Sequence, residues 1–252
     1  MVGHLDAALV PGMTARVREL WRYPVKSLLG ERLSGADVGA QGIAGDRGWA
    51  LFDVATGLGL TARRVPELLF AAARSRPDGS VAVVLPDGTV TADDAVLSRW
   101  VGREVVLRRA ADVAGARTYE NPFDVTGDEE AGWDPFQGAD GAFHDNAGAR
   151  VTLVSTGTLG SWDPRRFRAN VVLDGAGEDD WVGTSVLVGA VALDVVDRVP
   201  RCVMVTRPQA GGIARDTGVL RTVHRQRGGA LAVGALVTRP GPVSVGDEVR
   251  PA

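Results

Sequence analysis

Alternating apolar and polar residues run through the first half of the chain and predict a set of short strands. Residues 16–23 alternate in this way and stop at Pro24, while residues 49–54 form a strongly apolar run. Asp-Gly pairs at 78–79 and 87–88 are hairpin signals on either side of another apolar run. The strands predicted for this half lie over 16–23, 34–38, 49–54, 81–85 and 105–107.

Two other segments of the first half predict helices. Residues 92–101 carry Asp93 and Asp94 in their first turn, where acidic side chains favour the N-terminus of a helix. A shorter helix is predicted around residues 67–73, directly after the turn residues that end at Pro66.

The segment 112–150 differs from both halves because it shows little periodicity. It contains Asn-Pro and Asp-Pro turns and five acidic residues between Asp124 and Asp134. These acidic residues lack the spacing of an EF-hand, so we interpret them as a solvated loop rather than a calcium site. Loops of this length are functional or disordered, and the aromatic residues in this one predict that part of it packs.

The second half of the chain again predicts short strands with tight turns, a pattern typical of a small barrel. Ser155 is placed to cap a short helix through 159–162. Turns are predicted at 189–190, 216–218 and 240–241. The predicted strands are 151–154, 167–173, 186–193, 198–206, 231–237 and 243–249. The chain as a whole is therefore expected to be mainly β with a few helices, an α+β protein.

Composition narrows the function classes. The chain has 252 residues, of which 45% are hydrophobic and 23% charged, which is ordinary for a globular protein. Its net charge is −3, so the overall charge does not favour binding to nucleic acid. A single cysteine excludes an internal disulfide and a multi-cysteine zinc or iron–sulfur site, and the three histidines lack metal-ligand spacing. No apolar run reaches about 18 residues, and residues 1–12 lack a basic leader, so we expect a cytoplasmic protein without a membrane span or signal peptide.

The only cysteine, Cys202, follows Arg201 within the apolar segment 199–206. An adjacent guanidinium favours the thiolate, which is a nucleophile and a soft metal ligand. A small buried and inert thiol is the alternative. A Cys–His dyad with His144 or His224 also stays open, whereas the hydrolase elbow, P-loop and dinucleotide-binding glycine motifs are absent.

Several basic and polar residues occupy predicted turns rather than solvated helix faces. They are Lys26, Ser27, Arg47, Arg168, Asn170 and Arg201. Each alone is an ordinary surface residue, but together they would form an anion pocket in which arginine forks grip phosphate. A thiolate over such a pocket suits a phosphate-bearing cofactor with a soft metal centre.

Separated segments of the chain resemble the MOSC family of molybdenum-cofactor proteins, in the two-part branch that includes the mitochondrial amidoxime-reducing component. Leu-Trp-Arg-Tyr-Pro-Val-Lys-Ser at 20–27, Gly-Asp-Arg-Gly-Trp at 45–49 and Phe-Arg-Ala-Asn-Val-Val at 167–172 are similar to family segments. Arg201-Cys202 and Asp-Thr-Gly-Val at 216–219 follow in the family's order, and Pro-Gly at 240–241 and Val-Gly-Asp at 245–247 match its closing strand. The resemblance covers roughly residues 14 to 250.

This resemblance implies an N-terminal MOSC-associated β domain over 14–115, packed on a MOSC domain over 116–252 in which a long loop, 116–150, leads into a β-barrel. It implies that Cys202 is the protein thiolate on molybdenum and the catalytic cysteine. The residues implied to bind the cofactor are Lys26, Ser27, Arg47, Asn146, Arg168, Asn170, Arg201 and Cys202. The chain departs from the amidoxime-reducing branch at Ala169, Pro200 and Gly234.

The activity implied is a molybdenum cofactor-dependent oxidoreductase that reduces N-hydroxylated or N-oxide substrates. Because we find no ferredoxin-type extension, we expect electrons from a separate flavin or iron–sulfur reductase. The other expected partner is a small-molecule substrate, and we expect no binding to nucleic acid or membrane. Pyridoxal phosphate is not expected as a cofactor. The protein is expected to be a monomer. Two alternatives stay open: a sulfur carrier with a persulfide on Cys202, and a non-catalytic carrier of the cofactor.

Overall fold

The computed structural model describes residues 15–113, 117–122 and 132–252. Within these ranges the chain is mostly β, with three α-helices: α1 (Asp94–Val101), α2 (Thr156–Leu159) and α3 (Thr217–Arg227). The predicted mainly β fold is therefore confirmed. The acidic residues 124–130 of the long connection, and residues 1–12, lie outside the described residues.

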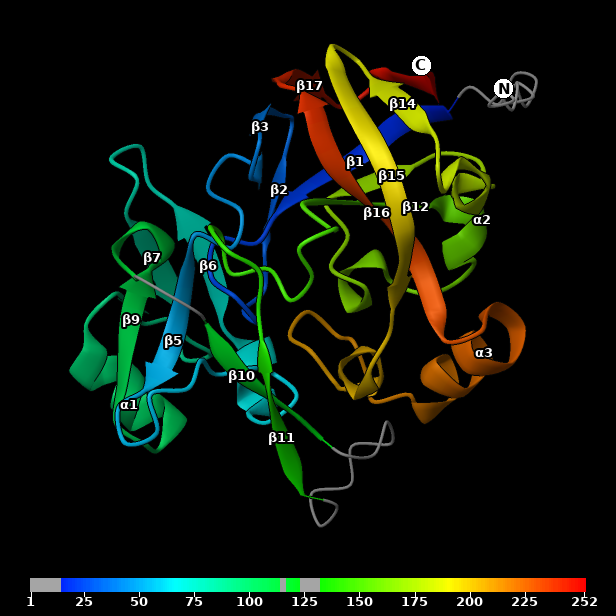
Figure 1. The fold of residues 1–252 in the computed structure, drawn as a ribbon. Coiled ribbons are helices and arrows are strands. Elements are labelled where there is room, and N and C mark those ends of the chain that lie inside the picture. Colours follow the sequence, from blue (N-terminus) through cyan, green and yellow to red (C-terminus); the bar gives the residue numbers. More distant parts are fainter. Residues whose placement is uncertain (1–14, 114–116, 123–131) are drawn as a thin grey trace, which may run out of the picture.

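A closed barrel forms one side of the molecule (Figure 1). Its strands follow one another in the order β13, β12, β16, β15, β14, β18 and β1, and the pairing of β1 with β13 closes the ring. Their bounds are β1 Ala15–Arg22, β12 Val151–Ser155, β13 Val171–Leu173, β14 Ser185–Val188, β15 Val191–Pro200, β16 Ala230–Arg239 and β18 Glu248–Pro251. A short strand, β2 (Glu31–Leu33), extends β1 at the edge.

Smaller sheets make up the rest of the chain. Hairpins and short pairs suit the Asp-Gly turns of this region, which supply the left-handed residue of a tight turn. The sheets are β17–β3–β4 (Gly241–Ser244, Gly35–Gly39, Gly42–Ile43), β5–β9 (Trp49–Asp53, Val105–Arg109), β6–β7–β8 (Ala72–Ser75, Val81–Val84, Val90–Thr91) and β10–β11 (Thr118–Pro122, Trp133–Gln137).

Strands from the first half of the chain pair with strands from the second half. β1 pairs with β13 in the barrel, and β17, near the C-terminal end, pairs with β3, near the N-terminal end. Val17 and Leu20 therefore lie in the barrel core, whereas the second core contains Leu51 and Leu68. Burying one such leucine contributes about 1.5–3 kcal/mol, so both cores stabilise the fold, and the barrel core draws on both halves of the chain. The domain boundary at 115 stays a prediction, and strands from before and after this residue pair with each other.

Helix α3 corrects the predicted turn at 216–218. Asp216 caps this helix by accepting a hydrogen bond from the Gly218 amide at 2.8 Å. Val219, Leu220 and Val223 form its buried stripe. The helical period was missed because only these few apolar residues mark it, between many arginines.

Three other predicted elements end differently in the structure. The helix around 67–73 is a 3₁₀ turn, η1 (Pro66–Phe70), that passes into strand β6, because Pro66 starts a short turn with no side-chain cap. The predicted strand over 198–206 ends at Pro200 and continues after Cys202 as the 3₁₀ helix η6 (Val203–Thr206). Of 167–173 only β13 is extended, because Arg168 has a positive φ of 53°.

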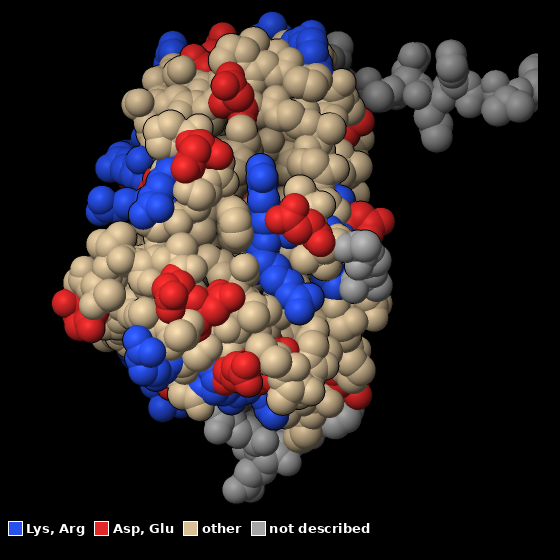
Figure 2. Space-filling model, turned by 90° about the vertical axis from the view of Figure 1, so that its left-hand side faces the viewer, with Lys and Arg blue, Asp and Glu red and all other residues tan. Residues whose placement is uncertain are grey.

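None of the helices in the described part of the chain has the length and apolar character needed to cross a bilayer. On the face drawn in Figure 2, basic and acidic side chains are interspersed, with a short row of basic side chains near the centre.

Candidate functional site

Three of the predicted site residues share an unusual backbone conformation. Among the described residues, the non-glycine residues with positive φ are Ser27 (69°), Arg47 (49°), Arg168 (53°) and Ala232 (72°). A left-handed conformation costs an ordinary residue about 1–2 kcal/mol, so it persists only where the surroundings enforce it. Such strain clusters at functional sites, and here it selects three of the predicted turn residues.

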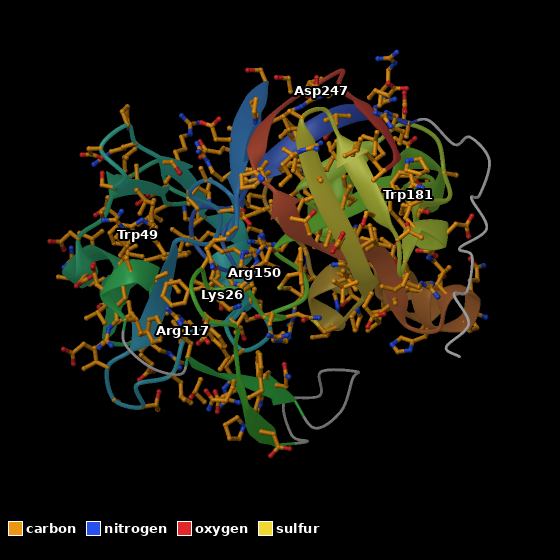
Figure 3. All side chains as sticks on the ribbon, turned by 45° about the horizontal axis from the view of Figure 1, so that its top comes forward. Lys26, Trp49, Arg117, Arg150, Trp181 and Asp247 are labelled. Carbon is orange, nitrogen blue, oxygen red and sulfur yellow. The ribbon has the colours of Figure 1, made fainter. Side chains whose placement is uncertain are left out.

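Lys26 and Ser27 lie in the buried turn that follows β1. The Lys26 amide donates to the Trp49 carbonyl at 2.8 Å, which attaches the turn to β5. The Ser27 hydroxyl accepts the Ala62 amide at 3.0 Å and so positions the loop before η1, while its own O–H has no acceptor among the described residues. Figure 3 shows Lys26 at the centre of the molecule, between the barrel and the smaller sheets.

The ammonium group of Lys26 is surrounded by polar partners although its side chain is only 7% exposed. It donates to the Phe143 carbonyl at 3.1 Å, pairs with Asp145 and lies 4.2 Å from the centre of the Tyr119 ring. Burial lowers the pKa of Lys26 to about 8, against the opposing effect of the Asp145 carboxylate.

Arg47 and Arg168 meet over the ring of Tyr23. Their guanidinium carbons lie 5.3 Å and 4.3 Å from the ring centre, and burial raises the pKa of Tyr23 to about 12. Arg47 also pairs with the buried Asp46, which in turn accepts the Tyr23 amide at 2.7 Å. The Tyr23 ring contacts both Arg47 and Arg168, and the Asp46 carboxylate also pairs with Arg47, so these groups hold the two neighbouring guanidinium groups in place.

Arg168 and Arg201 are held by main-chain carbonyl oxygens. Arg168 donates to the Leu28 carbonyl at 2.6 Å, and Arg201 donates to the Leu231 and Phe167 carbonyls at 2.7 and 2.8 Å. The second terminal nitrogen, Nη2, of both is buried and finds no partner within the described ranges. Burial lowers the pKa of both guanidinium groups to about 10.

Cys202 is half-buried and precedes η6. The side chain of Arg63 lies near it. Burial lowers the pKa of Arg63, but Asp145 and Cys202 outweigh burial and raise it above its ordinary value. No hydrogen bond joins Cys202 to His144 or His224 in the part of the chain that the structure describes, so the geometry does not favour a Cys–His dyad.

The two predicted asparagines hold structural positions. Asn170 is fully buried, and its side-chain oxygen accepts from the Thr152 amide and hydroxyl at 3.2 and 3.1 Å. Its side-chain nitrogen donates to the Trp21 carbonyl at 3.3 Å, so Asn170 joins three barrel strands. Asn146 is exposed and accepts the Gly148 amide at 2.8 Å within its own loop. Contact of either residue with a cofactor stays a prediction.

Sequence reasoning missed Arg63 and Asp145 as members of this site. Arg63 follows the apolar residues 58–60 in a turn, which is the same signal that selected the other arginines. Asp145 directly precedes the chosen Asn146. Nothing local shows that it pairs with Lys26 and Arg63, because these partners come from segments far away in the chain.

The site carries more positive than negative charge. Its basic side chains are Lys26, Arg47, Arg63, Arg168 and Arg201, and its acidic side chains are Asp46 and Asp145. Buried charges are stable only when paired, so the excess predicts an anionic ligand. The Nη2 donors of Arg168 and Arg201, unpaired among the described residues, meet this requirement, and the soft thiol of Cys202 follows Arg201 directly in the chain, so these residues fit a phosphate-bearing cofactor with a metal centre.

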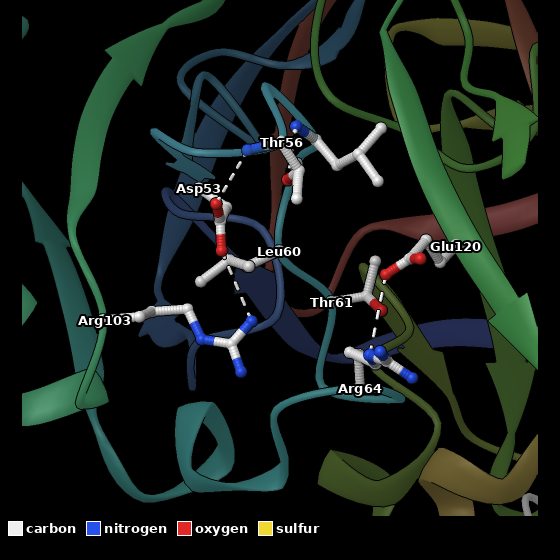
Figure 4. Close-up of a pocket in the computed structure, with 9 residues that line it drawn as sticks. Asp53, Thr56, Leu60, Thr61, Arg64, Arg103 and Glu120 are labelled. Atoms are coloured by element: carbon white, nitrogen blue, oxygen red, sulfur yellow. Dashed lines mark hydrogen bonds and ion pairs between the residues drawn. The ribbon is translucent and has the colours of Figure 1, made fainter. Parts of the chain in front are cut away.

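Two cavities of the structure lie away from Cys202. The smaller, of about 90 Å³, is shown in Figure 4, where ion pairs Asp53–Arg103 and Arg64–Glu120 already satisfy its charges. The larger, of about 730 Å³, runs along the loop that carries Asp46 and along Ala142. We place the functional site at the cation cluster rather than in either cavity, because the cluster holds the unpaired donors and the thiol.

The fold and this cluster define a class of two-part β proteins with a basic, cysteine-bearing site. Family models identify the class. The MOSC N-terminal beta barrel domain matches residues 14–115 and the MOSC domain matches residues 142–250. The chain therefore belongs to the MOSC family, in the two-part order predicted from the sequence, and this membership is consistent with binding of a molybdenum cofactor.

Solved structures that match the chain share little sequence with it. The YuaD protein from Bacillus subtilis is 14% identical, with 94% of each chain covered and a TM-score of 0.43. YiiM from Geobacillus stearothermophilus is 14% identical over 54% of this chain and 72% of that chain, with a TM-score of 0.35. Comparison with the curated proteins gave no match.

Proposed function

We propose that this protein binds a molybdenum cofactor and acts as an oxidoreductase that reduces N-hydroxylated or N-oxide substrates. The observation that carries the proposal is the cluster of buried cations that includes Arg201, the residue before the half-buried Cys202, in a chain of the MOSC family. Two of these cations, Arg168 and Arg201, keep an unused donor each among the described residues, which supports binding of a phosphate-bearing group.

The bound cofactor would supply the redox chemistry, and the protein would bind and orient it. Cys202 would provide the thiolate ligand that a soft metal prefers. The residues proposed to hold the remainder of the cofactor are Lys26, Ser27, Arg47, Asn146, Arg168, Asn170 and Arg201.

The arginine side chains of the site would act mainly by being preorganised for an anionic ligand. Arg201 is held by two carbonyl oxygens and Arg168 by one, so their free nitrogens are oriented before any ligand arrives. Donors that need no reorganisation bind an anion more tightly than mobile side chains do. Arg63 would place a positive charge near Cys202.

A sulfur carrier is the second candidate, because the same Arg63 would also balance the negative charge of a persulfide on Cys202. The half-buried state of the thiol leaves it reachable by a sulfur donor. Incubation with a cysteine desulfurase, followed by mass spectrometry, would then show a gain of one sulfur atom on Cys202. We rank this function second because the basic cluster extends well beyond the thiol.

Metal analysis tests the main proposal. Protein made in a host that produces the cofactor should contain molybdenum at a ratio near one per chain, and should reduce benzamidoxime when a suitable reductase is added. Cys202→Ala should lose both the metal and the activity, while Asp53→Asn, at the separate small cavity, should keep the metal. Full activity in Cys202→Ala would refute the proposal. Stoichiometric cofactor without reduction of any tested substrate would indicate a non-catalytic carrier.

The separate electron donor, the small-molecule substrate, the monomeric state and the cytoplasmic location stay predictions. The pocket that selects the substrate is expected to draw on residues 116–147, part of which lies outside the described residues.

A further inference from the structure

Asp145 binds two buried cations from the solvent side. Its side chain is 49% exposed, whereas those of Lys26 and Arg63 are 7% and 10% exposed. One carboxylate oxygen, Oδ1, pairs with Nζ of Lys26, and the other, Oδ2, accepts from Nη2 of Arg63 at 3.1 Å. The two cations hold the pKa of Asp145 well below its usual range. An exposed carboxylate is therefore the counterion of two cations inside the site.

Asp46, the other acidic residue of the site, is attached quite differently. Its side chain is fully buried, pairs with Arg47 and accepts the Tyr23 amide at 2.7 Å. Asp46 is thus a fixed part of the fold. Asp145 accepts hydrogen bonds only from Lys26 and Arg63 within the described residues, and its neighbours Asn146 and Ala147 are exposed. Moving its side chain outward would disrupt no packed core.

Lys26 and Arg63 require an anion because neither can reach bulk water freely. A carboxylate supplies one negative charge and two oxygens. A phosphate monoester supplies between one and two charges and three oxygens. Additional donors of the cluster lie unused on Arg168 and Arg201, so the larger anion satisfies more of the site than Asp145 does.

We propose, building on the proposed function, that Asp145 is an exchangeable internal anion. Its carboxylate bridges Lys26 and Arg63 in the cofactor-free protein and turns to solvent when the phosphate of the cofactor takes its place. The exchange keeps both cations paired at every stage. It also sets the affinity of the site, because every incoming phosphate must displace a carboxylate that is already bound.

The test measures binding of inorganic phosphate to cofactor-free protein by calorimetry, at constant ionic strength adjusted with chloride. Asp145→Asn should bind phosphate about tenfold more tightly than the wild type, because one competing charge is removed at contact distance. Asp140→Asn is the matched control, since Asp140 lies in the same loop, is 97% exposed and is 3.8 Å from Arg117 instead. Its affinity should stay within about twofold of the wild type. Equal or weaker binding by Asp145→Asn would overturn the proposal, and acetate in place of phosphate should show a smaller gain.

A second variant locates the effect. Adding Lys26→Met to Asp145→Asn should abolish the gain, and a gain that persists would overturn the proposal by placing the phosphate elsewhere. Asp145→Asn should also melt at a lower temperature than the wild type in chloride and recover in phosphate. Failure to recover counts against the exchange.

Molybdenum content of the wild-type protein is measured separately. A wild type that takes up no molybdenum refutes the proposed function, while the phosphate affinities still decide the exchange. Molybdenum uptake together with unchanged phosphate affinity in Asp145→Asn refutes the exchange alone.

Discussion

The guanidinium of Arg47 donates a hydrogen bond to the main-chain carbonyl of Arg168 at 3.2 Å. These residues are 121 positions apart, both have positive φ, and both lie over the ring of Tyr23. This contact joins the loop before β5 to the barrel directly beside the cation cluster. The site is therefore formed by the packing of the two halves, and its residues also hold those halves together.

Because Arg168 has a positive φ, we expect its glycine variant to be more stable than its alanine variant, the reverse of the usual order in a helix. Arg168→Ala and Arg168→Gly remove the same side chain, but only glycine adopts φ 53° without strain. Arg168→Gly should therefore be more stable than Arg168→Ala by about 1 kcal/mol in urea unfolding. Arg99, exposed in α1, is the control, where alanine should be the more stable by about 1 kcal/mol. The same order at both positions would show that the Arg168 backbone is unstrained.

Asn170 and Asn146 should differ sharply although both were predicted to bind cofactor. Asn170→Ala leaves the buried donors of Thr152 without their acceptor, so the free energy of unfolding should fall by about 1–3 kcal/mol even without cofactor. Asn146→Ala removes one exposed hydrogen bond within a loop and should cost about 0.5 kcal/mol or less. Chemical denaturation of cofactor-free protein measures both. Equal losses would contradict the structural role assigned to Asn170.

The Tyr23 ring should matter more than its hydroxyl group. The hydroxyl makes only a long contact of 3.5 Å to the Ala169 carbonyl, whereas the ring supports Arg47 and Arg168. Tyr23→Phe should keep stability within about 1 kcal/mol of the wild type. Tyr23→Leu should lose about 2–4 kcal/mol and weaken phosphate binding, because both arginines lose their support. A larger loss in Tyr23→Phe than in Tyr23→Leu would refute this ranking.

Acid should destabilise the protein through His144. Burial, together with the charge of Arg47, lowers the pKa of His144 from 6.5 to about 3. The unfolded chain therefore binds a proton between these values that the folded chain excludes, and stability falls as the pH drops below 6.5. His144→Phe should remove this contribution, which is at most about 1.4 kcal/mol per pH unit. Urea unfolding between pH 4.5 and 6.5 measures the slope, and an unchanged slope in the variant contradicts the assignment.

The strands and the basic turn residues could be predicted from the sequence because their signals are local. Apolar alternation located β1 closely, an apolar run located β7, and Asp-Gly pairs located the turns of the β6–β7–β8 sheet. Polar and basic residues at strand ends selected Ser27, Arg47 and Arg168, which the structure then shows in strained turns. Helix α3 escaped prediction because its short apolar stripe is surrounded by arginines.

By itself, then, the sequence determined the mainly β class, the two-part family and most of the cation cluster, since these depend on residue type, spacing and local backbone preference. Only the tertiary structure decided that β1 closes the barrel and that the buried side chain of Asn170 hydrogen-bonds to Thr152. It alone joined Asp145 to Lys26 and Arg63. These facts depend on contacts between residues far apart in the chain, where burial strengthens each charge and leaves an unpaired one costly.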